Sequence, residues 1–318
     1  MPQKTYWHLL EQRRVPTEYE VVSTKLHYYA HKGFEVELPW QEWYAKYQVG
    51  SPLACTNWEQ FADPRQTTYA TYTGIQATKE LFVDGLLESV ETIDYDRRLS
   101  KDWVHVLERV LPPALYPFHG LQMIAAYIGQ MGPSGRITLT ALFQVADEIR
   151  RIQRLAYRQR QLNDVWPGFG THAKLAWQTD PAWQPLRGCV EQLLVTYDWG
   201  EAFVGLNLVL KPLVDEVLMR HLGERARAAG DYLLQQVLLS LDEDGQWQRQ
   251  WSQALVALAV QDTPANRPII HGWLDKWHPR AHEAVNAVAA LFEPLPPHGR
   301  LADLPRQLDQ ALRAHLGR

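Results

Sequence analysis

The sequence has few cysteines and no long hydrophobic run. Cys55 and Cys189 are its only cysteines in 318 residues, and they show no metal-binding or redox spacing, so a reducing cytoplasm is the simplest location. The richest apolar stretch, Ala254 to Val260, is too short to span a bilayer. The first residues lack the apolar core and the small-residue cleavage site of a signal peptide. We therefore expect a cytoplasmic protein without a membrane partner.

A surplus of basic charge is also missing. The 32 Lys and Arg residues are outnumbered by 36 Asp and Glu residues, which argues against nucleic acid as the main partner. The strongest basic feature is a row formed by Arg150, Arg151, Arg154, Arg158 and Arg160. Because the chain is acidic overall, we interpret this row as a solvated or partner-paired face.

Common catalytic motifs are absent as well. The sequence contains no P-loop, no G-x-G-x-x-G, no G-x-S-x-G and no H-E-x-x-H. The pairs His27/His31 and His278/His282 have the i,i+4 spacing that can chelate a metal. Neither pair has a carboxylate arranged to complete a metal cage, so we interpret both pairs as structural.

Large aromatic rings, by contrast, are abundant. The chain has 13 Trp and 14 Tyr residues, and such rings are favoured where a surface is buried against another protein. A Trp-rich core is the alternative explanation, and the sequence leaves both open. With 46% hydrophobic residues the chain has enough apolar material for one large domain or two ordinary ones.

Residues 1–64 show little helical periodicity. Apolar and polar residues alternate, as in Tyr19-Glu20-Val21 and residues 34–38, and several prolines interrupt them. We predict an extended N-terminal arm over 1–64 whose aromatic rings lie on another surface, either its own domain or a partner. The candidate interface residues are Trp7, Tyr19, Tyr28, Tyr29, Trp40, Trp43 and Tyr44.

From Arg65 onward the apolar pattern is helical, which predicts an all-α domain over 65–318. Pro112, Pro113 and Pro117 are expected to break one helix, whereas Pro212 is expected to kink another without ending it. The predicted helices are 65–92, 100–111, 118–131, 137–163, 187–222, 224–243, 246–261, 267–292 and 301–316.

The clearest helical pattern is at 137–163. The apolar stripe contains Ile137, Leu142, Val145, Ile149, Ile152 and Ala156, and Asp147, Arg150, Arg154 and Arg158 fall largely on the other side. Glu148 is the exception, because its position borders or joins the stripe that we expect to be buried. Arg151 follows three residues later and can pair with it, so we predict a buried or half-buried Glu148–Arg151 ion pair.

Long helices of this kind build the diiron four-helix bundle, in which two helices give a lone Glu and two others give Glu-x-x-His. The sequence contains no Glu-x-x-His. Its best helix reads Asp147-Glu148-Ile149-Arg150-Arg151, with Arg where the His would be. A guanidinium cannot ligate iron, but its positive charge can replace the neutralisation that a metal would supply.

A second, weaker candidate lies in the stretch from Leu241 to Gln248. Two registers are possible, either Glu243 with Gln246 or Gly245 with Gln248, and neither contains His. An Asp-Glu pair in a helix is common and usually solvated, so the sequence alone does not choose between a vestigial metal position and an ordinary surface.

Several segments together resemble a known family. The chain resembles the beta (small) subunit of the hydroxylase in bacterial multicomponent diiron monooxygenases, nearest to the toluene, phenol, alkene and isoprene group. The resemblance is carried along most of the chain by Tyr6-Trp7, Pro16 to Tyr28, Trp43 to Tyr47, Ser51-Pro52-Leu53, His119 to Met123, Tyr127 to Ser134, Tyr197 to Phe203, Leu206 to Val209, Lys211-Pro212, Trp251 to Val256 and Gly272 to Trp277.

The resemblance implies a ferritin-like helical bundle that has lost the iron site of its catalytic relative. The family's alpha chain carries Asp-Glu-x-Arg-His at two positions, which makes Glu148 and Arg151 the counterparts of a ligand pair. Tyr127 and the neighbourhood of Glu201 to Asn207 are candidates for the lone-Glu positions. No catalytic residue and no cofactor are expected on this chain.

The same resemblance implies partners and a reaction. An assembly with two copies each of alpha, beta and gamma subunits would oxidise a small hydrocarbon with dioxygen. Electrons from NADH would arrive through a reductase and a Rieske-type ferredoxin, and an effector protein would control turnover. The alternatives are a self-contained diiron oxidase of the same fold and a helical binding module unrelated to oxygen chemistry.

Overall fold

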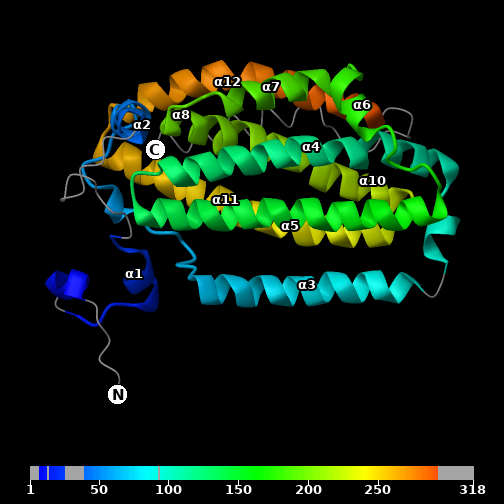
Figure 1. Cartoon of the computed structure of the whole chain (residues 1–318), viewed down its shortest axis with the longest axis horizontal. Coiled ribbons are helices and arrows are strands. Elements are labelled where there is room, and N and C mark those ends of the chain that lie inside the picture. Colours follow the sequence, from blue (N-terminus) through cyan, green and yellow to red (C-terminus); the bar gives the residue numbers. More distant parts are fainter. Residues whose placement is uncertain (1–6, 13, 26–38, 92–93, 293–318) are drawn as a thin grey trace.

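The computed structural model describes residues 7–12, 14–25, 39–91 and 94–292, and within these residues every regular element is helical. Long helices lie side by side along one axis (Figure 1). This arrangement confirms the predicted all-α bundle. The predicted helix at 301–316 lies outside the described residues.

Four helical rods make up the bundle. Three of them are α4 (Lys101–Met131), α5 (Gly135–Val165) and α11 (Tyr232–Asp262). The fourth rod runs without a break from α8 (Trp199–Phe203) through η6 (Val204–Leu210), α9 (Lys211–Asp215) and η7 (Glu216–His221) to α10 (Leu222–Ala228). Both η6 and η7 are π-helical, a form that is rare and often found at functional sites.

Further helices flank these rods. On one edge of the bundle in Figure 1 lie α12 (Asn266–Ala289) and α7 (Gln184–Leu194), and on the opposite edge lies α3 (Tyr69–Glu91). Shorter elements are α6 (Ala173–Thr179), which the sequence did not predict, η5 (Tyr95–Arg98) and η8 (Ala290–Phe292). None of the described helices combines the length and apolar composition needed to cross a membrane.

The tryptophans contribute heavily to the core. The largest fully buried side chains include those of Trp103, Trp183, Trp199, Trp251 and Trp277, each less than 2% exposed or at that limit. Rings of this size bury large apolar areas and therefore dominate core energetics. For these residues the Trp-rich core, not a partner surface, explains the composition.

The predicted break at Pro112, Pro113 and Pro117 is wrong, because α4 continues through all three. A proline inside a helix leaves the carbonyl four residues earlier without its helical donor. For Pro113 that carbonyl belongs to Arg109, and the indole Nε1 of Trp183 donates a hydrogen bond to it at 3.2 Å. A tertiary contact thus replaces the lost helical bond.

The predicted helix 187–222 is in fact two helices. The first, α7, ends at Leu194, and the next begins at Trp199. The carboxylate of Asp198 accepts a hydrogen bond from the N–H of Glu201 at 2.9 Å and so caps the new helix.

The predicted boundary near residue 245 is also wrong. α10 ends at Ala228, where Gly230 takes the left-handed backbone conformation that terminates helices. After the cap at Asp231, α11 runs through Gly245 to Asp262 without interruption. The predicted helices 224–243 and 246–261 are therefore one helix, α11, over most of their length.

The N-terminal region contains short helices where alternation predicted extended backbone. Tyr19 to Val21 lie in α1 (Glu18–Ser23), because Thr17 and Glu20 form a reciprocal capping box. The other described elements of this region are η1 (Trp7–Gln12), α2 (Pro39–Tyr44), η3 (Ala45–Val49) and η4 (Trp58–Gln60).

Candidate functional site

The charged face of α5 points into the bundle. Glu148 is fully buried and Arg151 is 2% exposed, whereas Leu142 and Ile149 of the apolar stripe are 53% and 42% exposed. The expectation that the stripe faces the core is therefore wrong for its middle part. Periodicity identifies two faces of a helix but not which of them is inside, because charged side chains that pair across helices can also be buried.

Four side chains form what we call the buried tetrad: Glu148 and Arg151 of α5 with Lys211 and Asp215 of α9. Lys211 Nζ lies 2.8 Å from Glu148 Oε1 and 2.9 Å from Asp215 Oδ2. Arg151 Nη1 lies 2.8 Å from Asp215 Oδ1 and 3.3 Å from Glu148 Oε2. The predicted Glu148–Arg151 pair is confirmed as a buried one. Two acids face two bases, so the formal charges of the tetrad cancel.

The tetrad holds its charges although it is buried. Burial alone would raise the pKa of Asp215, but Arg151 and Lys211 outweigh it and hold this pKa at about 2. Burial likewise opposes the charge of Arg151, yet Asp215 and Glu148 raise the pKa of the guanidinium above its usual value. Mutual pairing therefore keeps this site ionised inside an apolar bundle.

The two other rods complete the surroundings of the tetrad with uncharged residues and one cation, Arg249 of α11, whose Nη1 lies 3.8 Å from Asp215 Oδ2. From α4, the ring of Phe118 lies 5.0 Å from the guanidinium carbon of Arg151. From α11, Gly245 lies so close that a Cβ there would stand 2.8 Å from Asp215 Oδ2. Gln248, one turn further along, is 3% exposed.

Of the two registers that the sequence left open on α11, Gly245 with Gln248 faces the bundle interior. The Glu243 side chain is 61% exposed and pairs with Lys79 at 3.3 Å, and Gln246 is exposed as well. Glu243 and Gln246 therefore lie on the outside of the helix.

These residues do not fit a diiron centre. The two carboxylates of the tetrad are bridged by a guanidinium and an ammonium, and neither group has a lone pair for a metal while it is protonated. Phe118 and Gly245 supply no ligand at all. In the described part of the chain, no three His, Cys, Asp or Glu side chains gather in a way that could hold a metal ion.

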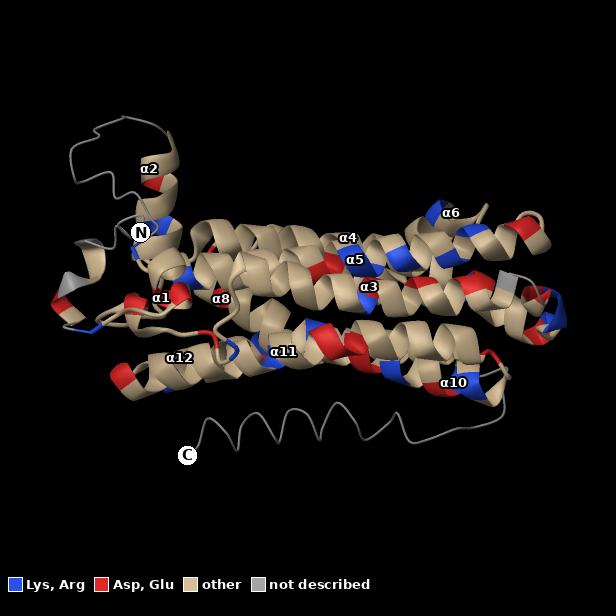
Figure 2. Ribbon diagram, turned by 90° about the horizontal axis from the view of Figure 1, so that it is seen from below, with Lys and Arg blue, Asp and Glu red and all other residues tan. Residues whose placement is uncertain are grey.

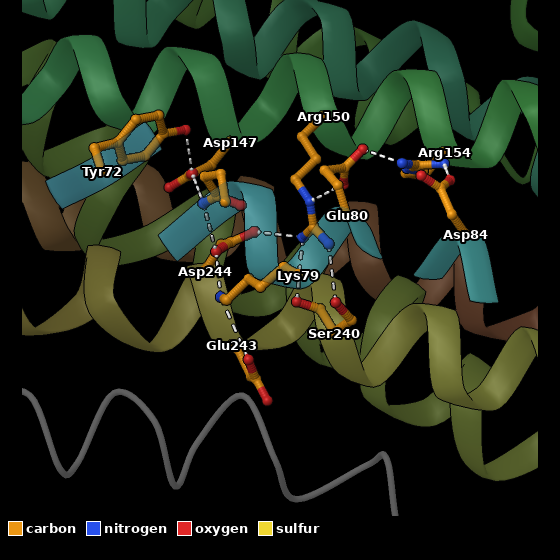
Figure 3. A network of polar contacts seen from close by, with 11 residues as sticks. Tyr72, Lys79, Glu80, Asp84, Asp147, Arg150, Arg154, Ser240, Glu243 and Asp244 are labelled. Atoms are coloured by element: carbon orange, nitrogen blue, oxygen red, sulfur yellow. Dashed lines mark hydrogen bonds and ion pairs between the residues drawn. The ribbon is translucent and has the colours of Figure 1, made fainter. Parts of the chain in front are cut away.

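A second polar network surrounds Asp147 and Asp244 (Figure 3). Asp147 accepts hydrogen bonds from Tyr72 Oη at 2.8 Å, Gln76 Nε2 at 2.9 Å and Gln248 Nε2 at 3.0 Å. Burial and the nearby charge of Asp244 raise the pKa of Asp147 to about 8, although the bonds from Gln248 and Tyr72 oppose this shift.

Asp244 in turn binds two cations. Lys79 Nζ lies 2.6 Å and Arg150 Nη1 2.8 Å from its carboxylate. Because Tyr72, Gln76 and Lys79 all belong to α3, this network fastens α3 to α5 and α11.

The arginine row of α5 is paired mostly within the chain. Arg150 also binds Glu80 of α3 at 2.6 Å, and Arg154 contacts both Glu80 and Asp84. Arg158, fully buried, binds Asp96 at 2.5 Å. The interpretation of the row as a solvated or partner-paired face is wrong for Arg150, Arg151 and Arg158, and only Arg160 has a largely exposed side chain, at 73%.

The candidates for the lone-Glu positions lie away from the tetrad or offer no carboxylate to it. Tyr127 donates a hydrogen bond to the carbonyl of Tyr197 at 2.6 Å, and Glu201 binds Lys276. Asn207 is buried and bonds to Gln144 and Ser252.

Sequence reasoning missed Lys211 and Asp215. A signal was present, because a Lys and an Asp four residues apart interrupt the apolar run from Ala202 to Leu218. Opposite charges at that spacing on a buried helix must pair with each other or with another helix.

The aromatic interface candidates divide into two groups. Tyr19 is 4% exposed, and Trp43 and Tyr44 pack on the chain's own core, where Trp43 Nε1 donates to Tyr127 Oη at 3.1 Å. Trp40 is 58% exposed. Trp7 begins η1, and Tyr28 and Tyr29 lie outside the described residues.

The two histidine pairs lie in different parts of the chain. His27 and His31 are outside the described residues, whereas His278 and His282 lie on α12 with ring centroids 5.7 Å apart.

Comparison with known proteins gives a consistent result. The sequence profile described as Methane/Phenol/Alkene Hydroxylase matches residues 43–263. The beta subunit of the toluene-4-monooxygenase hydroxylase component of Ectopseudomonas mendocina is 37% identical over 92% of this chain and 91% of its own length. An oxygenase component of phenol 2-monooxygenase from Pseudomonas sp. strain CF600 is 27% identical over 78% of this chain and 76% of its own.

Solved structures agree. A chain of toluene 4-monooxygenase, determined with toluene in its resting active site, superimposes with a TM-score of 0.87, at 37% identity and over 92% of this chain and 98% of that one. A chain of phenol hydroxylase from Pseudomonas sp. OX1 shares the fold, with a TM-score of 0.84 at 21% identity over 100% of this chain and 95% of that one.

Proposed function

This chain belongs to the Methane/Phenol/Alkene Hydroxylase family as a beta subunit of a multicomponent monooxygenase hydroxylase, and from this membership we propose that it is a structural subunit without a catalytic centre of its own. It works with partner subunits. The diiron centre is proposed to lie on a partner alpha subunit, and no cofactor is proposed for this chain.

The observation that supports this proposal is the buried tetrad. Arg151 and Lys211 contribute two positive charges between Glu148 and Asp215. We interpret this cluster as the place where a diiron protein of this fold would hold metal ions. The carboxylates are therefore neutralised by side chains that fold with the protein. We interpret Glu148/Arg151 and Gly245/Gln248 as vestigial ligand positions.

The self-contained diiron oxidase is disfavoured by the same donor set. That function needs imidazole ligands beside the carboxylates. Here those positions hold Arg151 and Gln248. Family membership also argues against a helical binding module unrelated to oxygen chemistry.

The proposed reaction of the assembled enzyme is hydroxylation or epoxidation of a small hydrocarbon with dioxygen and electrons from NADH. The names of relatives support this class, since they include a toluene monooxygenase, a phenol monooxygenase and a propane monooxygenase. Alkenes, isoprene included, are further candidate substrates. The cytoplasm is the proposed location.

The proposed assembly contains two copies each of alpha, beta and gamma subunits. A Rieske-type ferredoxin and an effector protein would bind this assembly, and a reductase would feed it electrons. Within it, the proposed physical role of this chain is to bury a large apolar surface and so to fix the geometry of the partner that carries the metal.

Iron counting on the assembled hydroxylase tests the proposal. If only the partner holds metal, the complex contains one diiron centre for each copy of this chain, and changing Glu148→Gln leaves that ratio unchanged. A second diiron centre for each copy, lost specifically in the Glu148→Gln variant, would show that this chain is a metalloprotein.

A further inference from the structure

The fourth rod contains a turn, η6, that is wider than an α-turn. At its end the N–H of Lys211 donates a hydrogen bond to the carbonyl of Leu206, which lies five residues earlier instead of four. A turn closed in this way holds one residue more than an α-turn. The rod runs along the bundle from α8 to α10 (Figure 2), and η6 lies between α8 and α9.

Apolar burial does not explain this wide turn. Every residue from 202 to 211 is buried, and most of these residues are apolar. A helix that is apolar on all sides can rotate about its axis with little change in the apolar area that it buries. Because wide turns are rare, specific contacts on either side of η6 must set the rotation of the rod and so require the extra residue.

Two glycines set the rotation at the start of the rod. A Cβ at Gly200 would stand 2.8 Å from the Cβ of Leu53. A Cβ at Gly205 would stand 2.5 Å from Leu193 Cδ2 of α7 and 3.3 Å from the indole of Trp277 on α12. Because every residue except glycine carries a Cβ, only the side of the rod that bears these two glycines can face these neighbours.

The buried tetrad sets the rotation after η6. Lys211 and Asp215 are the first and last residues of α9, and both contact α5. Lys211 Nζ lies 2.8 Å from Glu148 Oε1, and Asp215 Oδ1 lies 2.8 Å from Arg151 Nη1. A rotation of α9 by one residue, about 100°, would break both contacts and leave buried charges unpaired.

We propose that the tetrad selects the register of the fourth rod, by which we mean the rotation of this helix about its axis relative to α5. The glycines hold the first part of the rod, the tetrad holds α9, and η6 takes up the one residue by which the two settings differ. Buried ion pairs contribute little net stability compared with apolar packing, and selection of one register is the best attested use of buried polar groups. The four charges thus have a positioning role that involves no metal.

Deletion of a single residue tests whether η6 holds an extra one. In the assembled hydroxylase, deletion of Val209 should convert η6 to an α-turn while the contacts of Gly205 and Lys211 remain. The complex should therefore still assemble, as measured by co-purification with a tagged partner subunit, and should melt within about 5 °C of the native complex.

The matched control is deletion of Val237, because Val209 and Val237 are both 1% exposed. Val237 lies in α11, which is α-helical throughout. Its deletion rotates one part of that helix against the other by about 100° and should prevent assembly. Loss of assembly with both deletions would contradict the proposal, because the rod would then have no residue to spare.

Removal of the charges of α9 tests the role of the tetrad. In the Lys211→Met/Asp215→Leu variant, Glu148 and Arg151 can still neutralise each other, since they lie 3.3 Å apart in the native chain. In a crystal structure of this variant hydroxylase, we expect α9 to be rotated by about 100°. The N–H at position 211 should then bind the carbonyl four residues earlier, as in an α-helix.

The control for this variant is Glu216→Leu, which removes a charge from the next residue of the same rod while Arg220 keeps its contact with Asp242 at 3.0 Å. It should leave the bond from Lys211 to Leu206 unchanged. Retention of the wide turn in the Lys211→Met/Asp215→Leu variant would overturn the proposal. Failure of that variant to assemble, while the Val209 deletion is tolerated, would also overturn it, because the charges would then serve stability instead of register.

Discussion

Arg151 lies between the carboxylates of Glu148 and Asp215, and we interpret its position as one where a diiron protein would need an imidazole ligand. Changing Arg151→Leu leaves Glu148 with Lys211 alone, and leaves Asp215 with Lys211 and the more distant Arg249, whose Nη1 lies 3.8 Å away. We expect the free energy of unfolding to fall by about 3–5 kcal/mol, because removing one partner leaves a buried charge uncompensated.

The control for this variant is Arg160→Leu on the same helix. The Arg160 side chain is 73% exposed and binds Asp164 near the surface, so its loss should cost less than about 1 kcal/mol. Chemical denaturation of both variants measures the difference. A cost for Arg151→Leu as small as that for Arg160→Leu would mean that the tetrad does not stabilise the bundle.

Asp147 predicts a pH dependence of stability. Its pKa of about 8 lies well above the value near 4 of an unfolded aspartate, so between those pH values the folded chain holds a proton that the unfolded chain has released. The contribution of this group to the free energy of unfolding therefore decreases as pH rises from about 4 to about 8. Urea denaturation at several pH values should show a smaller decrease over this window for Asp147→Asn than for the native chain.

Asp215 acts in a different window and does not obscure that measurement. Its pKa of about 2 lies below the unfolded value, so its stabilisation is complete above about pH 4 and is lost as pH falls toward 2. An unchanged slope between pH 5 and 8 in the Asp147→Asn variant would contradict the assignment of that proton to Asp147.

Among the individual residues of the site, the sequence predicted only some. The Glu148–Arg151 pair followed from helical spacing and from the cost of burying a carboxylate alone. Lys211 and Asp215 could not be assigned to the same cluster, because they lie more than fifty residues away along the chain and no sequence pattern encodes which rod faces which.

Among the helices, α11 shows how a glycine that weakens a helix can still be required. A Cβ at Gly245 would stand 2.8 Å from Asp215 Oδ2, whereas nothing lies within 4 Å of a Cβ at Gly74 on α3. We expect Gly245→Ala to destabilise the chain, because a buried charged group would have to move. Gly74→Ala should instead stabilise it by up to about 1 kcal/mol through helix propensity, and thermal unfolding of the two variants should differ in sign.

α3 depends on polar contacts more than on apolar burial. Of its side chains only Val83 and Leu87 are both apolar and buried, while Lys79 and Glu80 make ion pairs with α11 and α5. We expect Glu80→Gln to increase amide hydrogen exchange in α3 but not in α12, and added salt to act in the same direction. Glu88→Gln, a change at an exposed position of α3, is the control; equal exchange in both variants would show that the ion pairs do not hold this helix.

The helix boundaries show where local patterns lose to tertiary contacts. The existence of α3, α5 and α12 was predicted well, but α4 continues through three prolines. For one of them, Pro113, the indole of Trp183 supplies the donor that the Arg109 carbonyl loses. The orientation of α5 was predicted wrongly for the middle of its apolar stripe, because charged side chains that pair across helices can be buried in place of apolar ones.

For the molecule as a whole, the all-α bundle and the family were accessible from the sequence, since long periodic segments and many short motifs agree with them. The sequence also pointed to the aromatic N-terminal region as an interface, and of its candidates Tyr19 is buried within the chain whereas Trp40 is 58% exposed. The exposure of Leu142 and Ile149 on α5 could be recognised only in the folded structure.

We propose that side-chain charges occupy the place of a metal centre in this subunit. Anomalous X-ray diffraction at the iron absorption edge, on crystals of the assembled hydroxylase, would locate every bound iron. We expect iron peaks in the partner subunit and none among Glu148, Arg151, Lys211 and Asp215. An anomalous peak within coordination distance of Glu148 or Asp215 would show instead that this chain binds iron.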